Sequence, residues 1–192
     1  MSKLIITDKK YTVEEFMAFT AKEDLARYEL ADGDIYAMSS PSSNHQDIAG
    51  FIYSRFRDFF DKKKCKAYIA PLDVHLEADD RKNKSVFQPD VLVVCDANKI
   101  KRDGIHGAPD LVVEIVSPSS SATDYILKFK YYLKFKVKEY WIVDTEKILL
   151  FNLINDEYAA TIFHFSSVVT SRLFPDLKID FCQFDGEPPE TE

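Results

Sequence analysis

The sequence lacks an excess of positive charge and has no long apolar run. Its 192 residues carry 32 acidic against 25 basic side chains, a formal charge of −7. This balance excludes a histone-like or ribosomal polycation, and it argues against non-specific adhesion to nucleic acid because an acidic protein repels phosphates on average. No segment approaches the roughly 20 apolar residues that span a bilayer, and the N-terminus lacks the apolar core of a signal peptide. We therefore expect a soluble, cytoplasmic protein with no membrane partner.

Side chains that build thiol or imidazole metal sites are also sparse. The cysteines are odd in number, widely spaced and never arranged as CxxC: Cys65, Cys95 and Cys182. This pattern indicates neither a disulfide framework nor a cysteine zinc site, so a reducing cytoplasm is the simplest setting. Three of the histidines are scattered without metal-ligand spacing: His75, His106 and His164.

Apolar and aromatic residues, in contrast, are plentiful. Hydrophobic residues make up 46% of the chain and aromatic residues 14%, which excludes disorder as a description of the whole chain. The length suits one large domain or at most two small ones, and because neither repeats nor linkers interrupt the chain, we expect a single domain over residues 1–185. Residues 186–192 are predicted to form a disordered tail.

Helical and strand patterns alternate along the chain. Helices are predicted over 11–22, where Thr12 and Glu15 fit a capping box, and over 45–62 and 121–135. A hairpin is predicted over 28–36, followed by strands at 72–77, 86–95, 110–116, 138–144, 147–153, 158–165 and 177–181. The runs 86–95 and 110–116 are almost continuously apolar, which is typical of central strands. The fold class is therefore α/β (α+β) around one mixed sheet flanked by helices.

Two carboxylates lie in or beside apolar runs, where burial of a charge costs free energy. Glu114 stands inside the second apolar run, and Asp90 directly precedes Val91 in the first. A buried carboxylate must be paired, hydrogen-bonded, protonated or bound to a metal. One interpretation is a strand-edge carboxylate that pairs with lysine or caps a turn. The other is that both carboxylates converge on a hard divalent cation such as Mg²⁺, with Mn²⁺ as a substitute.

Lys128 lies on one stripe of the third predicted helix, with Asp124 four residues before it and Tyr132 four residues after it. The simple interpretation is a solvated lysine paired with Asp124. If the stripe faces metal-bound carboxylates, the ammonium could instead orient a water molecule and offset charge on a phosphate. His45, near the start of the second predicted helix, fits either a capping or surface position or a site-facing one.

Several blocks, in order, resemble one known family. They are Tyr28-Glu-Leu-Ala-Asp-Gly-Asp-Ile-Tyr36, Ser39-Ser-Pro-Ser42 with His45-Gln46, Gln88-Pro-Asp-Val-Leu-Val-Val94, Gly107-Ala-Pro-Asp-Leu-Val-Val-Glu-Ile-Val-Ser-Pro-Ser119, the stripe just described, and Glu139-Tyr-Trp-Ile-Val-Asp144. Together they resemble the Uma2 family of restriction-type endonucleases, within the PD-(D/E)-x-K nuclease superfamily. The resemblance covers about residues 25–155 and implies a restriction-endonuclease-like central mixed sheet flanked by helices.

The resemblance implies roles for individual residues. Asp90 and Glu114 take the places of the two acidic metal ligands. The superfamily usually has lysine two positions after the second acid, where this chain has Val116, and the resemblance implies that Lys128 supplies the amine instead. Glu29 matches a family acidic position and would add a ligand or orient water; the alternative is a surface carboxylate at the hairpin edge.

The predicted function is Mg²⁺-dependent hydrolysis of DNA phosphodiester bonds. Asp90 and Glu114 would be metal ligands and Lys128 the positioning cation, with DNA as the partner and a homodimer as a plausible assembly. The acidic total does not exclude DNA, since lysines concentrate at 62–66 and 128–138. Two alternatives remain: a catalytically inactive nuclease fold that binds nucleic acid or dimerises, and a hydrolase acting on RNA or a nucleotide.

Overall fold

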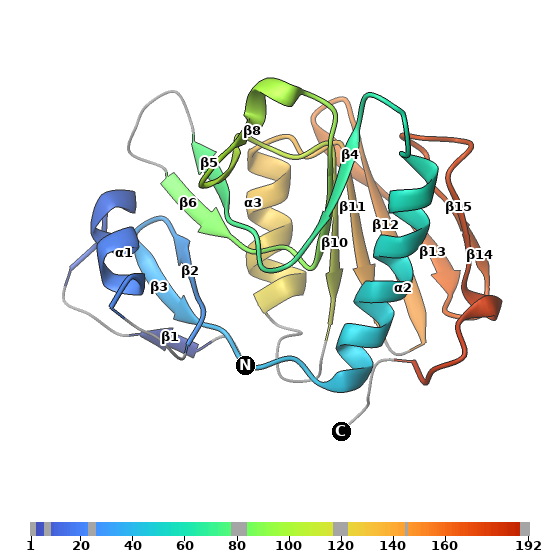
Figure 1. The fold of residues 1–192 in the computed structure, drawn as a ribbon, viewed down its shortest axis with the longest axis horizontal. Coiled ribbons are helices and arrows are strands. Elements are labelled where there is room, and N and C mark those ends of the chain that lie inside the picture. Colours follow the sequence, from blue (N-terminus) through green and yellow to red (C-terminus); the bar gives the residue numbers. More distant parts are fainter. Residues whose placement is uncertain are drawn as a thin grey trace.

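Two sheets hold most of the chain in the computed structural model of the protein, which describes residues 3–5, 9–22, 26–77, 84–116, 123–144 and 146–188 (Figure 1). The seven-stranded sheet has the order β1-β3-β2-β6-β5-β9-β8, with strands Lys3–Ile5, Asp34–Ala37, Tyr28–Ala31, Lys84–Phe87, Val74–Glu77, Gly104–His106 and Ile100–Lys101. The six-stranded sheet has the order β13-β12-β11-β10-β7-β4, with strands Glu157–His164, Lys147–Ile154, Glu139–Val143, Leu111–Ile115, Val91–Val94 and Lys66–Ile69. A separate pair joins β14 (Val168–Thr170) to β15 (Lys178–Asp180).

The helices begin where the sequence supplies capping groups. Helix α1 (Val13–Thr20) has the predicted capping box between Thr12 and Glu15, and α2 (Ser43–Phe59) is capped by the Ser42 hydroxyl. A π-helical segment, η2 (Thr123–Lys128), leads directly into α3 (Phe129–Lys134). The short 3₁₀ helices are η1 (Ala97–Lys99) and η3 (Phe181–Gln183).

The six-stranded sheet is buried on both faces. On one face, Ile48, Ile52 and Phe56 of α2 pack against alternate residues of the central strands, among them Val93, Val113 and Trp141. On the other face, the intervening residues Leu92, Val112 and Ile142 pack against α3 and the apolar side of the seven-stranded sheet. Figure 1 shows this arrangement, with α2 and α3 on opposite sides of β10 and β11. Burial on both faces explains the continuous apolar runs of these strands.

The α+β fold class is as predicted, but the strands are divided between two sheets. Residues 86–95, expected as one central strand, form the end of β6 in the seven-stranded sheet and β7 in the six-stranded sheet. The break falls at Gln88, Pro89 and Asp90. Proline has no backbone N–H to donate to a ladder, so it favours such a break. The chain therefore crosses from one sheet to the other immediately before Asp90.

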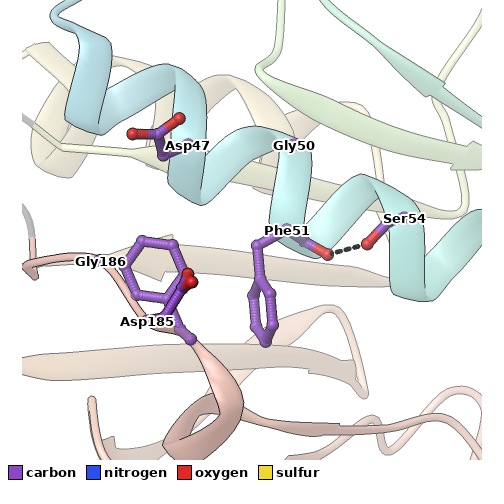
Figure 2. A pocket seen from close by; sticks show the side chains of 7 residues that line it. Asp47, Gly50, Phe51, Ser54, Asp185 and Gly186 are labelled. Atoms are coloured by element: carbon purple, nitrogen blue, oxygen red, sulfur yellow. Dashed lines mark hydrogen bonds between the residues drawn. The ribbon is translucent and has the colours of Figure 1, made fainter.

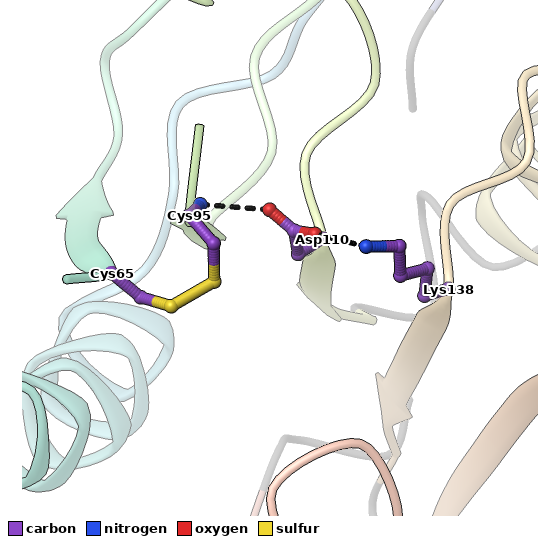
Figure 3. Close-up of a disulfide and its surroundings, with 4 residues drawn as sticks. All are labelled: Cys65, Cys95, Asp110 and Lys138. Carbon is purple, nitrogen blue, oxygen red and sulfur yellow. Dashed lines mark hydrogen bonds and ion pairs between the residues drawn. A yellow bond between two sulfur atoms is a disulfide. The ribbon is translucent and has the colours of Figure 1, made fainter. Parts of the chain in front are cut away.

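The expectation of unpaired cysteines is wrong for two of the three. Cys65 and Cys95 form a disulfide (Figure 3). Cys182 is free and exposed. The strands explain the pairing: Lys66 of β4 lies opposite Val94 of β7, and the disulfide joins the next pair along this register. A separation of 30 residues hides the pair in the sequence, because only the strand pairing brings the two residues together.

Some expectations fall partly outside the described residues. Of the predicted tail, 189–192 lie outside, whereas the Pro188 carbonyl accepts a 2.8 Å hydrogen bond from the Asn44 side chain. Residues 121–122 of the third predicted helix also lie outside, as does the side chain of Asp124. The single domain over 1–185 stays a prediction. Within the described residues, no helix has the length and apolarity needed to cross a membrane.

Candidate functional site

Asp90 and Glu114 lie on neighbouring strands at the same end of the six-stranded sheet. Strand β7 runs antiparallel to β10 with Val91 opposite Val113, so the register continued by one residue places Asp90 opposite Glu114. The backbone N–H of Ile115 donates a 2.8 Å hydrogen bond to Asp90 Oδ2, which holds this carboxylate against the end of β10. Directly opposed side chains on adjacent strands lie within contact of each other. The structure therefore places the two predicted metal ligands at neighbouring positions, at the adjoining ends of β7 and β10.

Lys128 and Glu29 complete a buried charged cluster with Glu114. The Lys128 Nζ lies 3.0 Å from Glu114 Oε1 and 3.2 Å from Glu29 Oε1, and these three side chains are at most 4% exposed. The Gln88 backbone N–H also donates to Glu29 Oε1, at 3.0 Å. Lys128 is therefore not a solvated lysine, and Glu29 is not a surface carboxylate at the hairpin edge.

Tyr132 holds Glu114 from the same side as Lys128. Its hydroxyl donates a 2.6 Å hydrogen bond to Glu114 Oε1. Burial raises the pKa of the Tyr132 hydroxyl well above its ordinary value, and the negative charges of Glu114 and Glu29 raise it further. The hydroxyl therefore stays protonated at neutral pH and acts as a hydrogen-bond donor.

A change of helical form positions Lys128. It is the last residue of the π-helical segment and occupies the N-cap position of α3, so Tyr132 follows it by one turn of the α-helix. Both side chains therefore lie on one stripe, as their spacing predicted, and the structure shows that this stripe faces Glu114. A π-helical turn widens the backbone and is found frequently at functional sites.

His45 joins the cluster from the start of α2. Its Nε2 lies 3.2 Å from Asp90 Oδ2, and both side chains are 15% exposed. The cap of this helix is Ser42, whose hydroxyl accepts from the His45 backbone N–H. Of the two interpretations of the sequence, the site-facing one is therefore the one observed. The pair of His45 and Asp90 is also the most exposed part of the cluster.

The charges of the cluster suit a divalent cation. Three carboxylates and one ammonium (Asp90, Glu114, Glu29 and Lys128) leave a formal charge of −2 with His45 neutral. An uncompensated charge is costly to bury. Carboxylate oxygens are ligands that Mg²⁺ and Mn²⁺ prefer, and the Asp90 side chain is partly exposed to solvent. The oxygen donors of Asp90 and Glu114 thus fit the ion predicted from the sequence.

A surface hollow lies away from the charged cluster. It has a volume of about 540 Å³ and is formed by α2 and the C-terminal segment, with Asp47, Phe51 and Asp185 among its lining residues (Figure 2). None of the lining residues belongs to the charged cluster. The chemistry of this hollow, two carboxylates beside phenylalanine rings, offers no cation for a phosphate, so we assign the candidate site to the cluster.

The expectation that the histidines are scattered is wrong for His75 and His106. They lie opposite each other on β5 and β9, with Asp103 close by. The sequence carried no signal for this group, because 31 positions separate the two histidines and only strand pairing joins them. His164 lies away from it, on β13.

Comparison with known proteins agrees with this architecture. A crystal structure of a "putative nuclease belonging to DUF820" from Anabaena variabilis has a TM-score of 0.72 and 18% sequence identity, and the match covers 91% of this chain and 97% of that one. At this identity the likeness shows the fold. An uncharacterized protein of Synechocystis sp. is 32% identical over 123 residues. That match covers 64% of this chain and spans 62% of the length of the relative. The Uma2 family model, described as "Putative restriction endonuclease", matches residues 13–182, and the chain belongs to this family.

Proposed function

We propose that the protein is a divalent-metal-dependent endonuclease that hydrolyses phosphodiester bonds of DNA. The convergence of Asp90, Glu114 and Lys128 in one cluster is the observation that carries the proposal. Membership of a family described as restriction endonucleases supports the reaction class. Mg²⁺ is the ion we assign, with Mn²⁺ as a substitute, because the available ligands are carboxylate oxygens.

Each residue of the cluster has a proposed role that follows from its chemistry. A bound divalent ion would neutralise the phosphate and lower the pKa of a water molecule. Asp90 and Glu114 would hold it through carboxylate oxygens. Lys128, fixed beside Glu114, would orient the attacking water and offset the charge that develops on the phosphate. Glu29 and Tyr132 fix the positions of Lys128 and Glu114, and His45 orients Asp90.

The position of Lys128 supports the proposal that it takes the role of the lysine usual in the PD-(D/E)-x-K superfamily. Val116, which stands at that usual position, is buried in the apolar cluster between the two sheets. Lys128 instead reaches the Glu114 carboxylate from the adjoining helical segment. An amine that arrives from another element at the same carboxylate can meet the same electrostatic need, so we propose that the cluster is competent for catalysis.

DNA binding would depend on local basic surface, because the whole chain is acidic. The cluster Lys62, Lys63, Lys64 and Lys66 is exposed at the end of α2 and at the start of β4. Four further exposed lysines follow Lys128, at positions 130, 134, 136 and 138. Such patches attract phosphates in a salt-dependent manner. A homodimer would place two cleavage sites about a two-fold axis, one for each strand of a duplex.

A specific observation also favours the non-catalytic alternative. Lys128 already neutralises Glu114, and the side chains of Glu29, Glu114 and Lys128 are almost fully buried. A cluster of this kind could hold the fold together in a protein that only binds nucleic acid. The enzyme and the binding module differ in one measurable property, which is cleavage.

The test is incubation of the purified protein with plasmid DNA, single-stranded DNA and RNA, with Mg²⁺, with Mn²⁺ or with a chelator. We expect ion-dependent cleavage of DNA that falls at least about 100-fold in Asp90→Asn, because a metal ligand is removed. The control is Asp58→Asn, which removes an exposed carboxylate of α2 and should cleave like the wild type. Cleavage of RNA alone would change the substrate. A folded wild type that binds DNA and cleaves no nucleic acid with either ion would establish the binding module instead.

A further inference from the structure

A second group of metal-ligand side chains lies at the far edge of the seven-stranded sheet. Strands β5 and β9 pair in parallel, and His75 lies opposite His106. Their imidazole rings are stacked, with centroids 4.5 Å apart and an angle of 22° between the planes. Asp103, in the turn between β8 and β9, lies with its Oδ1 3.2 Å from His106 Nε2. We propose that these three residues bind a transition-metal ion of the Zn²⁺ class.

The backbone holds the two strands that carry the histidines in fixed register. The Ile105 N–H donates to the Asp73 carbonyl, and the Gly107 N–H donates to the His75 carbonyl, each at 2.8 Å. Gly104 has a φ of +140°, and a Cβ at this position would clash with the Asp73 carbonyl oxygen. Only glycine allows this close approach, which brings β9 directly against β5. The ligand side chains thus stand on regular, hydrogen-bonded strands.

The burial of His75 gives an independent reason to assign a ligand to the group. Its side chain is 4% exposed, and its Nε2 is buried without a hydrogen-bond partner among the described residues. A buried polar nitrogen without a partner costs free energy, so such an atom calls for an explanation in a native fold. A metal ion held between His75 and its neighbours would supply the partner.

The arrangement of the donor atoms suits a small ion. One ligand atom from each of the three residues can be chosen so that all lie within 4.8 Å of one another. Two ligands at about 2.1 Å on a tetrahedral ion are about 3.4 Å apart. The 3.2 Å separation between His106 Nε2 and Asp103 Oδ1 is close to this value, and the Asp103 side chain is exposed.

The ligand types distinguish this group from the carboxylate and lysine cluster. Two imidazole nitrogens and one carboxylate oxygen favour Zn²⁺, Co²⁺ or Ni²⁺ over Mg²⁺, whereas the cluster around Glu114 offers carboxylate oxygens. Three protein ligands leave a fourth position for water. An ion here would join the turn between β8 and β9 to β5, and so stabilise the outer edge of the seven-stranded sheet.

The test measures Zn²⁺ and Co²⁺ binding to chelator-treated full-length protein by calorimetry, with the melting temperature and the visible absorption of bound Co²⁺ as separate readouts. The wild type should bind one equivalent at this site, and affinity should fall at least about 10-fold in His106→Gln and in His75→Gln. His106 and Asp103 are not fully buried, so His106→Gln and Asp103→Asn keep the test informative if His75→Gln fails to fold.

Two matched variants locate the bound ion. His164→Gln removes an exposed histidine outside the group, and Asp90→Asn removes a carboxylate of the other cluster. Both should bind Zn²⁺ like the wild type. The proposal is overturned if the wild type binds no Zn²⁺, if His106→Gln binds it as tightly as the wild type, or if Asp90→Asn is the variant that loses it.

Discussion

Glu114 and Glu139 are two buried carboxylates on adjacent strands, and their surroundings differ in kind. The Glu139 carboxylate accepts four hydrogen bonds from uncharged donors at 2.6–2.8 Å: Trp141 Nε1, Asn152 Nδ2 and the backbone N–H groups of Arg172 and Leu173. Glu114 lies instead beside the Lys128 ammonium and the Tyr132 hydroxyl, with Glu29 on the same lysine. A carboxylate that neutral donors surround ties segments of the fold together. A carboxylate that shares one cation with a second acid, as Glu114 shares Lys128 with Glu29, keeps a net negative charge that a bound cation would neutralise.

The largest effect on stability is expected from removing the Glu139 carboxylate. Glu139→Ala leaves four donors without their acceptor, two of them on the buried side chains of Trp141 and Asn152, and we expect the free energy of unfolding to fall by about 3–5 kcal/mol. Denaturant unfolding measures the loss. Glu139→Gln keeps one acceptor oxygen and should lose less. A change below about 1 kcal/mol in Glu139→Ala would show that the comparison between the two carboxylates is mistaken.

A smaller loss is expected from removing the shared cation. Lys128→Met keeps most of the side-chain volume but leaves Glu29 and Glu114 buried without their ammonium, so we expect a loss of about 2–4 kcal/mol. Lys130→Met, at an exposed position of α3, is the matched control and should change little.

Divalent ions sharpen this second prediction. With Lys128 removed, the cluster carries a larger negative charge, so Mg²⁺ should raise the melting temperature of Lys128→Met more than that of the wild type. Equal shifts in the two proteins would contradict a metal ion at this cluster. The same measurement on Glu139→Gln should show no enhanced response to Mg²⁺, because the donors to that carboxylate among the described residues are uncharged.

The smallest effect is expected at Tyr132. Tyr132→Phe removes one hydrogen bond to a charged acceptor and should lower the free energy of unfolding by about 1–2 kcal/mol at neutral pH. An unchanged unfolding midpoint would indicate that the hydroxyl contributes nothing to the position of Glu114.

The effect of Tyr132→Phe on stability should also depend on pH. The pKa of Tyr132 is raised in the folded protein, so above a pH of about 10 the hydroxyl ionises in the unfolded chain while it stays protonated in the fold. The folded state then binds more protons, and stability falls as the pH rises through this range. Tyr132→Phe should therefore lose stability less steeply above pH 10 than the wild type does.

Local features of the fold were predictable from the sequence, because neighbouring residues determine them. The capping box of Thr12 and Glu15 is present, and the predicted hairpin turns at Asp32 and Gly33, whose φ angles are +46° and +86°. The apolar runs at β7 and β10 are fully buried strands. A strand that is buried on both faces has a continuous apolar run in the sequence. The sequence has no comparable pattern that identifies the strands with which it pairs.

Contacts between distant segments account for what the sequence did not predict. Residues 86–95 gave one apolar run, although Pro89 separates two strands in two sheets. The Cys65–Cys95 disulfide depends on strand register. The position of Lys128 between Glu29 and Glu114 was anticipated only through family resemblance, since helical spacing alone also allowed a pair with Asp124. The buried charge of Glu139 gave no signal that separated it from Glu114.

The crossing of the chain at Gln88–Asp90 makes the charged cluster a product of both sheets. Glu29 belongs to the seven-stranded sheet, Glu114 to the six-stranded sheet, and Asp90 stands where the chain passes between them. A nascent chain that has formed only one sheet lacks at least one of the acidic partners. The constellation is therefore complete only once the two sheets have docked, and its presence reports on the tertiary fold as a whole.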